Sequence, residues 1–221
     1  MRVVLKFRRW YFYAFITLVL TIVTSPTWAQ KILSYTDQIY EPQIKTVQLS
    51  GSILEFDDLR DQRNNYYAKL IHCNYDWTKS NLSNLDFLQD YNEFNITDYI
   101  FSSGTHINYV HYRFQIPAVK LPGNYLIIIY RDGDEKNLII SKRFFKPDNR
   151  LALASNNLFG GGALQASNQQ LNFTLTYGGT EIINPLASVH VVIRQNQRWD
   201  NARMDVQPSF VRENEKQLEY R

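Results

Sequence analysis

The chain has 221 residues, of which 20% are charged and 14% aromatic, and its formal net charge is +3. Four of its 24 basic residues lie within the first nine positions, whereas none of its 21 acidic residues precedes Asp37. Beyond the opening segment, 20 basic residues therefore face 21 acidic ones, a net charge of −1. This balance excludes a global electrostatic attraction for nucleic acid, and no nucleic-acid partner is expected.

An export signal is predicted at the N-terminus. Basic side chains within residues 2–9 precede an apolar stretch over residues 10–23, and small residues close the segment. This order is typical of a secretory signal peptide, which would occupy residues 1–29 with cleavage between Ala29 and Gln30. A permanent membrane anchor is the alternative, but the apolar run is shorter than the ~20 residues that a helical span needs.

The exported part contains a single cysteine, Cys73, so no intramolecular disulfide can form and the fold must depend on its core. Cys73 ends an apolar run and is expected to be a buried structural thiol. His72 would point to the opposite face of a strand, so it cannot activate the thiol.

Period-two alternation and continuous β-branched runs predict an all-β protein. No segment shows apolar residues repeated at the spacing of a helix over several turns. The predicted strands are 44–50, 66–74, 110–116, 125–130, 138–145, 171–177 and 189–193. Residues 125–130 are apolar without interruption, which is typical of a strand covered on both faces. Gly133 is expected to supply the positive φ of a hairpin turn between the strands at 125–130 and 138–145.

The connection over residues 75–108 shows scattered aromatic residues but no clear strand. Phe87, Tyr91 and Phe94 can form one short helical face. A connection of this length is uncommon in a compact domain unless it is functional or has structure of its own.

A domain boundary is predicted near residue 150, where a polar, proline-containing segment follows the last of the early strands. The sequence predicts a β-sandwich over residues 31–148 and the start of a second β domain over residues 150–221. The second domain offers two good strands and a polar tail, too few strands to bury a core alone.

No motif for nucleophilic, metal-dependent or phosphate-binding chemistry is present, so neither a catalytic site nor a cofactor or metal is expected. The four histidines are dispersed at His72, His106, His111 and His190. An acidic cluster comprises Glu55, Asp57, Asp58 and Asp61. It could bind calcium, but it lacks the ordered spacing of a calcium loop and favours a solvated turn.

Four residues are predicted to contact a partner: Trp77, Phe159, Gly160 and Gly161. An exposed tryptophan can stack on a sugar or anchor an interface, although tryptophans more often cap the end of a sandwich core. The glycine run can approach a partner's backbone closely or serve as a plain linker.

A set of motifs in fixed order resembles a known family. They are the run from Tyr67 to Trp77 (YAKLIHCNYDW), Asp98-Tyr99, Ser102–Thr105, Tyr109–Tyr112, Phe114–Pro117, Gly123–Tyr125, the run from Val191 to Arg198, and Gln207-Pro208. Together they are similar to the plug protein of the type IX secretion system, and they span nearly all of the chain after the predicted signal.

The resemblance implies an exported, periplasmic protein built of immunoglobulin-like β-sandwich domains and associated with the outer membrane. Such a protein binds the periplasmic mouth of a large outer-membrane β-barrel translocon and closes it. No enzymatic activity and no small-molecule substrate are implied. Members of the family continue beyond the point that corresponds to Arg221, which predicts a truncated chain or a fragment.

A secreted carbohydrate-binding module is the main alternative, with Trp77 or Trp199 as a stacking platform. Such a platform requires coplanar exposed rings on one face, whereas a plug requires none. An accessory domain of a hydrolase would need paired carboxylates in a cleft, and the sequence offers no such pair.

Overall fold

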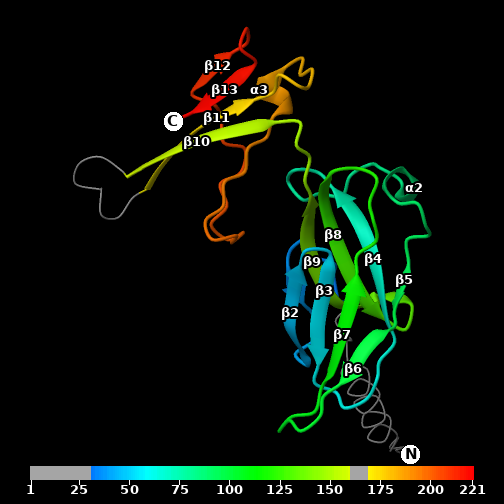
Figure 1. Cartoon of the computed structure of the whole chain (residues 1–221). Coiled ribbons are helices and arrows are strands. Elements are labelled where there is room, and N and C mark those ends of the chain that lie inside the picture. Colours follow the sequence, from blue (N-terminus) through cyan, green and yellow to red (C-terminus); the bar gives the residue numbers. More distant parts are fainter. Residues whose placement is uncertain (1–30, 160–168) are drawn as a thin grey trace, which may run out of the picture. The chain divides into compact units, whose positions relative to one another are not determined.

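The computed structural model describes residues 31–159 and 169–221 (Figure 1). Its secondary structure is almost entirely antiparallel strand, which confirms the predicted all-β class. Among the described residues, no helix is long and apolar enough to cross a membrane.

Two sheets form a sandwich in the first two thirds of the chain (Figure 1). The five-stranded sheet has the order β1-β9-β8-β4-β5, with β1 at Gln38–Ile39, β9 at Asp134–Lys146, β8 at Gly123–Arg131, β4 at Tyr66–Cys73 and β5 at Phe94–Ile96. The four-stranded sheet has the order β2-β3-β7-β6, with β2 at Ile44–Ser50, β3 at Ile53–Asp58, β7 at Val110–Gln115 and β6 at Asp98–Phe101.

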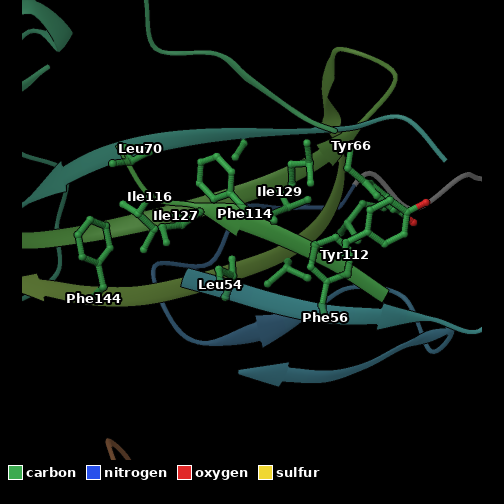
Figure 2. Close-up of a cluster of buried hydrophobic side chains, with 14 of the residues drawn as sticks. Leu54, Phe56, Tyr66, Leu70, Tyr112, Phe114, Ile116, Ile127, Ile129 and Phe144 are labelled. Carbon is green, nitrogen blue, oxygen red and sulfur yellow. The ribbon is translucent and has the colours of Figure 1, made fainter. Parts of the chain in front are cut away.

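The space between the two sheets is filled by apolar and aromatic side chains from both (Figure 2). Phe56 and Tyr112 of the four-stranded sheet stack with ring centroids 5.1 Å apart, and the ring of Tyr66 meets both edge-on. All three side chains are fully buried. Burial of each side chain of this size contributes about 1.5–3 kcal/mol, so this cluster is a main source of stability.

Strand β8 is covered on both faces, as its continuous apolar run predicts. Ile127 and Ile129 point into the sandwich core, whereas Leu126 and Ile128 belong to a second cluster on the outer face of the five-stranded sheet. The segment over residues 33–40 covers that outer face with partly buried side chains.

The turn between β8 and β9 has positive φ at both central residues, 58° at Asp132 and 73° at Gly133. The prediction for Gly133 is confirmed. Positive φ at both central residues is typical of a type I′ turn, whose twist matches that of the flanking strands.

The connection over residues 75–108 contains short elements that the sequence does not reveal: helix α2 at Asn84–Phe87, then β5 and β6. The predicted helical face is wrong. The helix ends at Phe87 because Leu88 is already extended, Tyr91 is 81% exposed and Phe94 lies in β5. The side chain of buried Asn92 accepts a hydrogen bond from the Leu70 N–H and donates one to the Leu70 carbonyl. It therefore satisfies the edge of β4 beyond the last residue that pairs with β5.

A third sheet, of order β10-β11-β13-β12, is formed by Ala152–Phe159, Gln169–Thr176, Gln217–Tyr220 and Phe210–Arg212 (Figure 1). The predicted strand at 189–193 is wrong. Its alternate apolar residues pack against the third sheet, but the backbone forms only an isolated bridge between Ile193 and Arg203. Asn184 caps a short helix before this segment, α3 (Pro185–Ser188), and the Ala187 N–H donates to the Asn184 side chain.

Candidate partner-binding surface

Most of the residues predicted from the sequence as functional lie outside the part of the chain that the structure describes. These are Ala29 and Gln30 at the predicted cleavage site and Gly160 and Gly161 in the glycine run. Phe159 is the last residue of β10, where its backbone pairs with Gln169. The cleavage site and the glycine contact remain predictions.

Trp77 is only 3% exposed, so it does not offer a free ring to a partner. Its ring meets the rings of Trp199 at 5.1 Å and Phe145 at 5.7 Å, both edge-on. The two tryptophan planes are inclined by 85° and cannot form a flat stacking platform. Trp77 thus caps a core in this structure, as the alternative interpretation of the sequence has it, and its contact with a partner remains a prediction.

Three members of the acidic cluster, Glu55, Asp57 and Asp58, lie in strand β3 and not in a solvated turn, whereas Asp61 is exposed in the bend that follows. Asp58 is fully buried at the end of β3 and accepts hydrogen bonds from the Tyr66 hydroxyl at 2.7 Å and from the Asn64 side chain at 2.8 Å. The carboxylate also pairs with Arg60, with 3.2 Å between Nε and Oδ1. Burial and this bond to Asp58 raise the pKa of Tyr66 well above its usual value.

The other acidic residues of β3 alternate onto its opposite face and are engaged there. Glu55 pairs with Arg113 at 3.0 Å, and the Oδ1 atom of Asp57 lies 2.7 Å from Nδ1 of His111. Each of the three carboxylates of β3 has a basic partner, and among the described residues no group of three or more His, Cys, Asp or Glu side chains is arranged to hold a metal ion. The cluster therefore stabilises the sheet.

Cys73 is the buried thiol that the sequence predicts. Burial raises its pKa to about 11, so the thiol stays protonated at neutral pH. His72 lies on the other face of β4, where its Nδ1 is 2.9 Å from the Ser80 hydroxyl and its ring meets Tyr125. The absence of contact between the two side chains agrees with the prediction from strand alternation.

Three exposed apolar side chains belong to β6 and the loop that follows it. Ile100 is 61% exposed, Phe101 52% and Ile107 63%. These three residues, named here the apolar tip, lie within eight positions of one another, in β6 and the loop that follows it; Figure 1 shows β6 at one end of the sandwich. Isolated exposed apolar residues are common, but three together favour a contact surface.

Polar contacts hold the loop of the apolar tip, and the Phe101 ring meets the Tyr99 ring edge-on at 5.8 Å. The backbone N–H of Ser102 donates to Tyr109 at 2.9 Å, and the N–H of Tyr109 returns a bond to the Ser102 hydroxyl. Gly104 bends the loop with a φ of 71°. Because β6 is the edge strand of its sheet, the tip also presents an unpaired strand edge.

Sequence reasoning did not identify Ile100, Phe101 or Ile107. The only signal was the consecutive apolar run Tyr99-Ile100-Phe101, which puts a large apolar side chain on both faces of a short strand. Whether such a strand is covered depends on its position in the sheet, which the sequence does not give.

The chain matches the model of a known protein family. The family described as "Type 9 secretion system plug protein 1st domain" matches residues 29–146, which is more than half of the chain and includes both sheets of the sandwich. No curated protein matches the chain.

A solved structure is also similar. The crystal structure of a hypothetical protein from Parabacteroides merdae is 25% identical, with a TM-score of 0.76. The match covers 86% of this chain but 53% of that one, so the present chain spans about half the length of its structural relative.

Proposed function

The chain belongs to the family of type IX secretion system plug proteins, and on that premise we propose that it is a periplasmic plug for the outer-membrane translocon of that system. Membership gives it a role in type IX secretion as an envelope-associated component. The proposal adds that the chain binds the periplasmic opening of a large β-barrel translocon and closes it, after export by its signal peptide. It acts by occupying space, without chemistry of its own.

The observation that carries the proposal is the match of the plug family to the whole sandwich, residues 29–146. A plug needs bulk and rigidity. The sandwich supplies both through two sheets packed over one aromatic core, with Phe56, Tyr66 and Tyr112 fully buried. Its only thiol is buried and protonated, which fits a mechanical role.

A plug must also leave the pore when cargo passes, so its contact surface should be of moderate size. The apolar tip fits this requirement, because it combines three exposed apolar side chains with a polar, hydrogen-bonded loop. We infer that Phe101 and Ile107 contact the translocon directly.

Changing the apolar tip tests this contact. The double variant Phe101→Asp, Ile107→Asp should fold normally, because both side chains are more than half exposed. Loss of two apolar anchors from a moderate interface should reduce recovery of the translocon by roughly tenfold or more in an affinity pull-down from outer-membrane extracts.

The control is Ile183→Asp, which makes one apolar-to-aspartate change at a side chain that is 95% exposed in the C-terminal third of the chain. It should recover the translocon like the unmodified protein. Equal recovery by the tip variant and the control would overturn the assignment of the contact to the tip. Failure of the unmodified protein to recover any large β-barrel would overturn the proposed function.

A further inference from the structure

Two arginines are held among aromatic rings on the outer face of the five-stranded sheet. The Cζ atom of Arg143, in β9, lies 4.5 Å from the ring centroid of Trp77 and 4.6 Å from that of Trp199. The Cζ atom of Arg194 lies 4.1 Å from the Trp199 centroid and 5.1 Å from that of Phe145. The aromatic faces fix both guanidinium groups in place.

Neither guanidinium group forms an ion pair within the described part of the chain. Arg143 donates from Nε to the Tyr35 carbonyl at 2.8 Å, and Arg194 donates to the Gln197 carbonyl at 3.4 Å. The nearest carboxylate, Asp37, pairs with Lys142 at 2.7 Å and accepts the backbone N–H of Arg143. Within residues 31–159 and 169–221, most of the donors of both arginines therefore have no acceptor.

The local electrostatics favour an added negative charge. Loss of solvation lowers the pKa of Arg143 from its usual value. Asp37 and the Cys73 thiol oppose this shift, and the positive charge of Arg194 adds a smaller lowering effect. This concentration of positive charge contrasts with the net charge of −1 for the chain after its opening segment. An anion in the cavity that both arginines line would be attracted by both guanidinium groups.

A cavity of about 340 Å³ lies at this cluster. It is lined by Asp37, Leu49, Gly51, Lys142, Arg143, Phe144, Phe145, Arg194, Gln197 and Trp199. Three lining side chains are cationic and one is anionic, while Leu49, Phe145 and Trp199 give apolar walls. Phe145 is 46% exposed, so the cavity can be reached from solvent.

We propose that this cavity binds a carboxylate on an apolar stem, supplied by an acidic residue or a chain terminus of a protein partner. Guanidinium groups match the two oxygens of a carboxylate with paired hydrogen bonds. The aromatic walls contact the methylene groups of the stem, which a free phosphate lacks. The inference rests on the proposed function only in taking the ligand from a protein partner.

The arginines also attach the segment around Trp199 to the sandwich, and a purely structural role would leave anions unbound. The two roles are separated by titrating the full-length protein with the peptide acetyl-Gly-Glu-Gly-amide and with its glutamine counterpart. Binding is followed through the indole N–H signals of Trp77 and Trp199 in NMR spectra. Saturable shifts with the glutamate peptide, and affinity weaker by roughly tenfold or more with the glutamine peptide, are expected.

Arg194→Gln keeps much of the side-chain stem, removes the charge, and should weaken binding of the glutamate peptide by roughly tenfold or more. Lys45→Gln removes a cation from β2, outside the cavity lining, and should bind like the unmodified protein. Unchanged binding by a folded Arg194→Gln variant would overturn the proposal. Should that variant unfold, the comparison of the glutamate and glutamine peptides on the unmodified protein still decides the question.

Two further ligands identify the source and the chemistry. Acetyl-Gly-Ala-Leu with a free terminal carboxylate tests a chain terminus, and binding of either this peptide or the glutamate peptide supports the proposal. Inorganic phosphate that shifts the same signals with equal affinity would overturn the carboxylate assignment, as would equal binding of the glutamate and glutamine peptides. Because the probes are peptides and the translocon is absent, a negative result would leave the proposed plug function untouched.

Discussion

Replacement of Asp58 by alanine is expected to lower the free energy of unfolding by about 3–5 kcal/mol, because it removes one partner from a buried ion pair and its hydrogen bonds. The carboxylate is fully buried and is shared by Tyr66, Asn64 and Arg60. Without it, the Tyr66 hydroxyl and the Arg60 guanidinium lose an acceptor at the end of the core. Urea unfolding followed by circular dichroism measures the change.

The matched control is Asp61→Ala, three residues further along the chain on an exposed position. It should change stability by no more than about 0.5 kcal/mol, as is usual for surface sites. A loss of less than about 1 kcal/mol for Asp58→Ala would contradict the structural role given to this carboxylate, because an unsatisfied buried partner alone costs more.

Truncation on either face of β8 is expected to be costly. Ile127→Ala removes a side chain from the sandwich core, and Ile128→Ala removes one from the outer cluster. Both residues are at most 2% exposed, so each change should lower the free energy of unfolding by about 2–5 kcal/mol. Urea unfolding of the two variants side by side measures both values.

The result for Ile128 tests whether residues 33–40 cover the outer face of the sheet. Ile100→Ala, on the exposed edge strand β6, serves as the control and should cost less than about 1 kcal/mol. If Ile128→Ala were as mild as this control, the outer face of β8 would be open to water in solution, contrary to the structure.

The parts of the fold that could be predicted from sequence are those fixed by local rules. The uninterrupted run over residues 125–130 identifies a strand buried on both faces, because no polar side chain interrupts it. Gly133 identifies its turn, because few other residues tolerate positive φ. Strand alternation also separates Cys73 from His72.

The wrong predictions concern segments whose structure depends on tertiary contacts. Strand β3 carries Glu55, Asp57 and Asp58, which indicate a solvated turn until their partners on other strands are known. The apolar alternation at 189–193 reports burial against the third sheet, but a strand also needs a partner for its backbone. Burial and hydrogen-bond pairing are separate requirements, and the sequence pattern reports only the first.

The candidate surface was the least predictable feature. Trp77 is of a residue type that is common at interfaces, yet Trp199, Phe145 and Arg143 bury it. Phe101 is of a residue type that is common in cores, yet it is 52% exposed. The reason is that β6 is an edge strand and Phe101 is its last residue. Exposure depends on which elements end where, and no local pattern reports this.

The most direct test of the plug function is the permeability of the outer membrane in cells that lack this gene. Entry of a large hydrophilic antibiotic, one that the intact outer membrane excludes, measures whether the translocon stands open. Deletion should raise uptake sharply, the unmodified gene should restore the barrier, and the Phe101→Asp, Ile107→Asp variant should restore it poorly. Uptake that stays at the wild-type level after deletion, in cells whose translocon is present, would contradict closure of the pore by this protein.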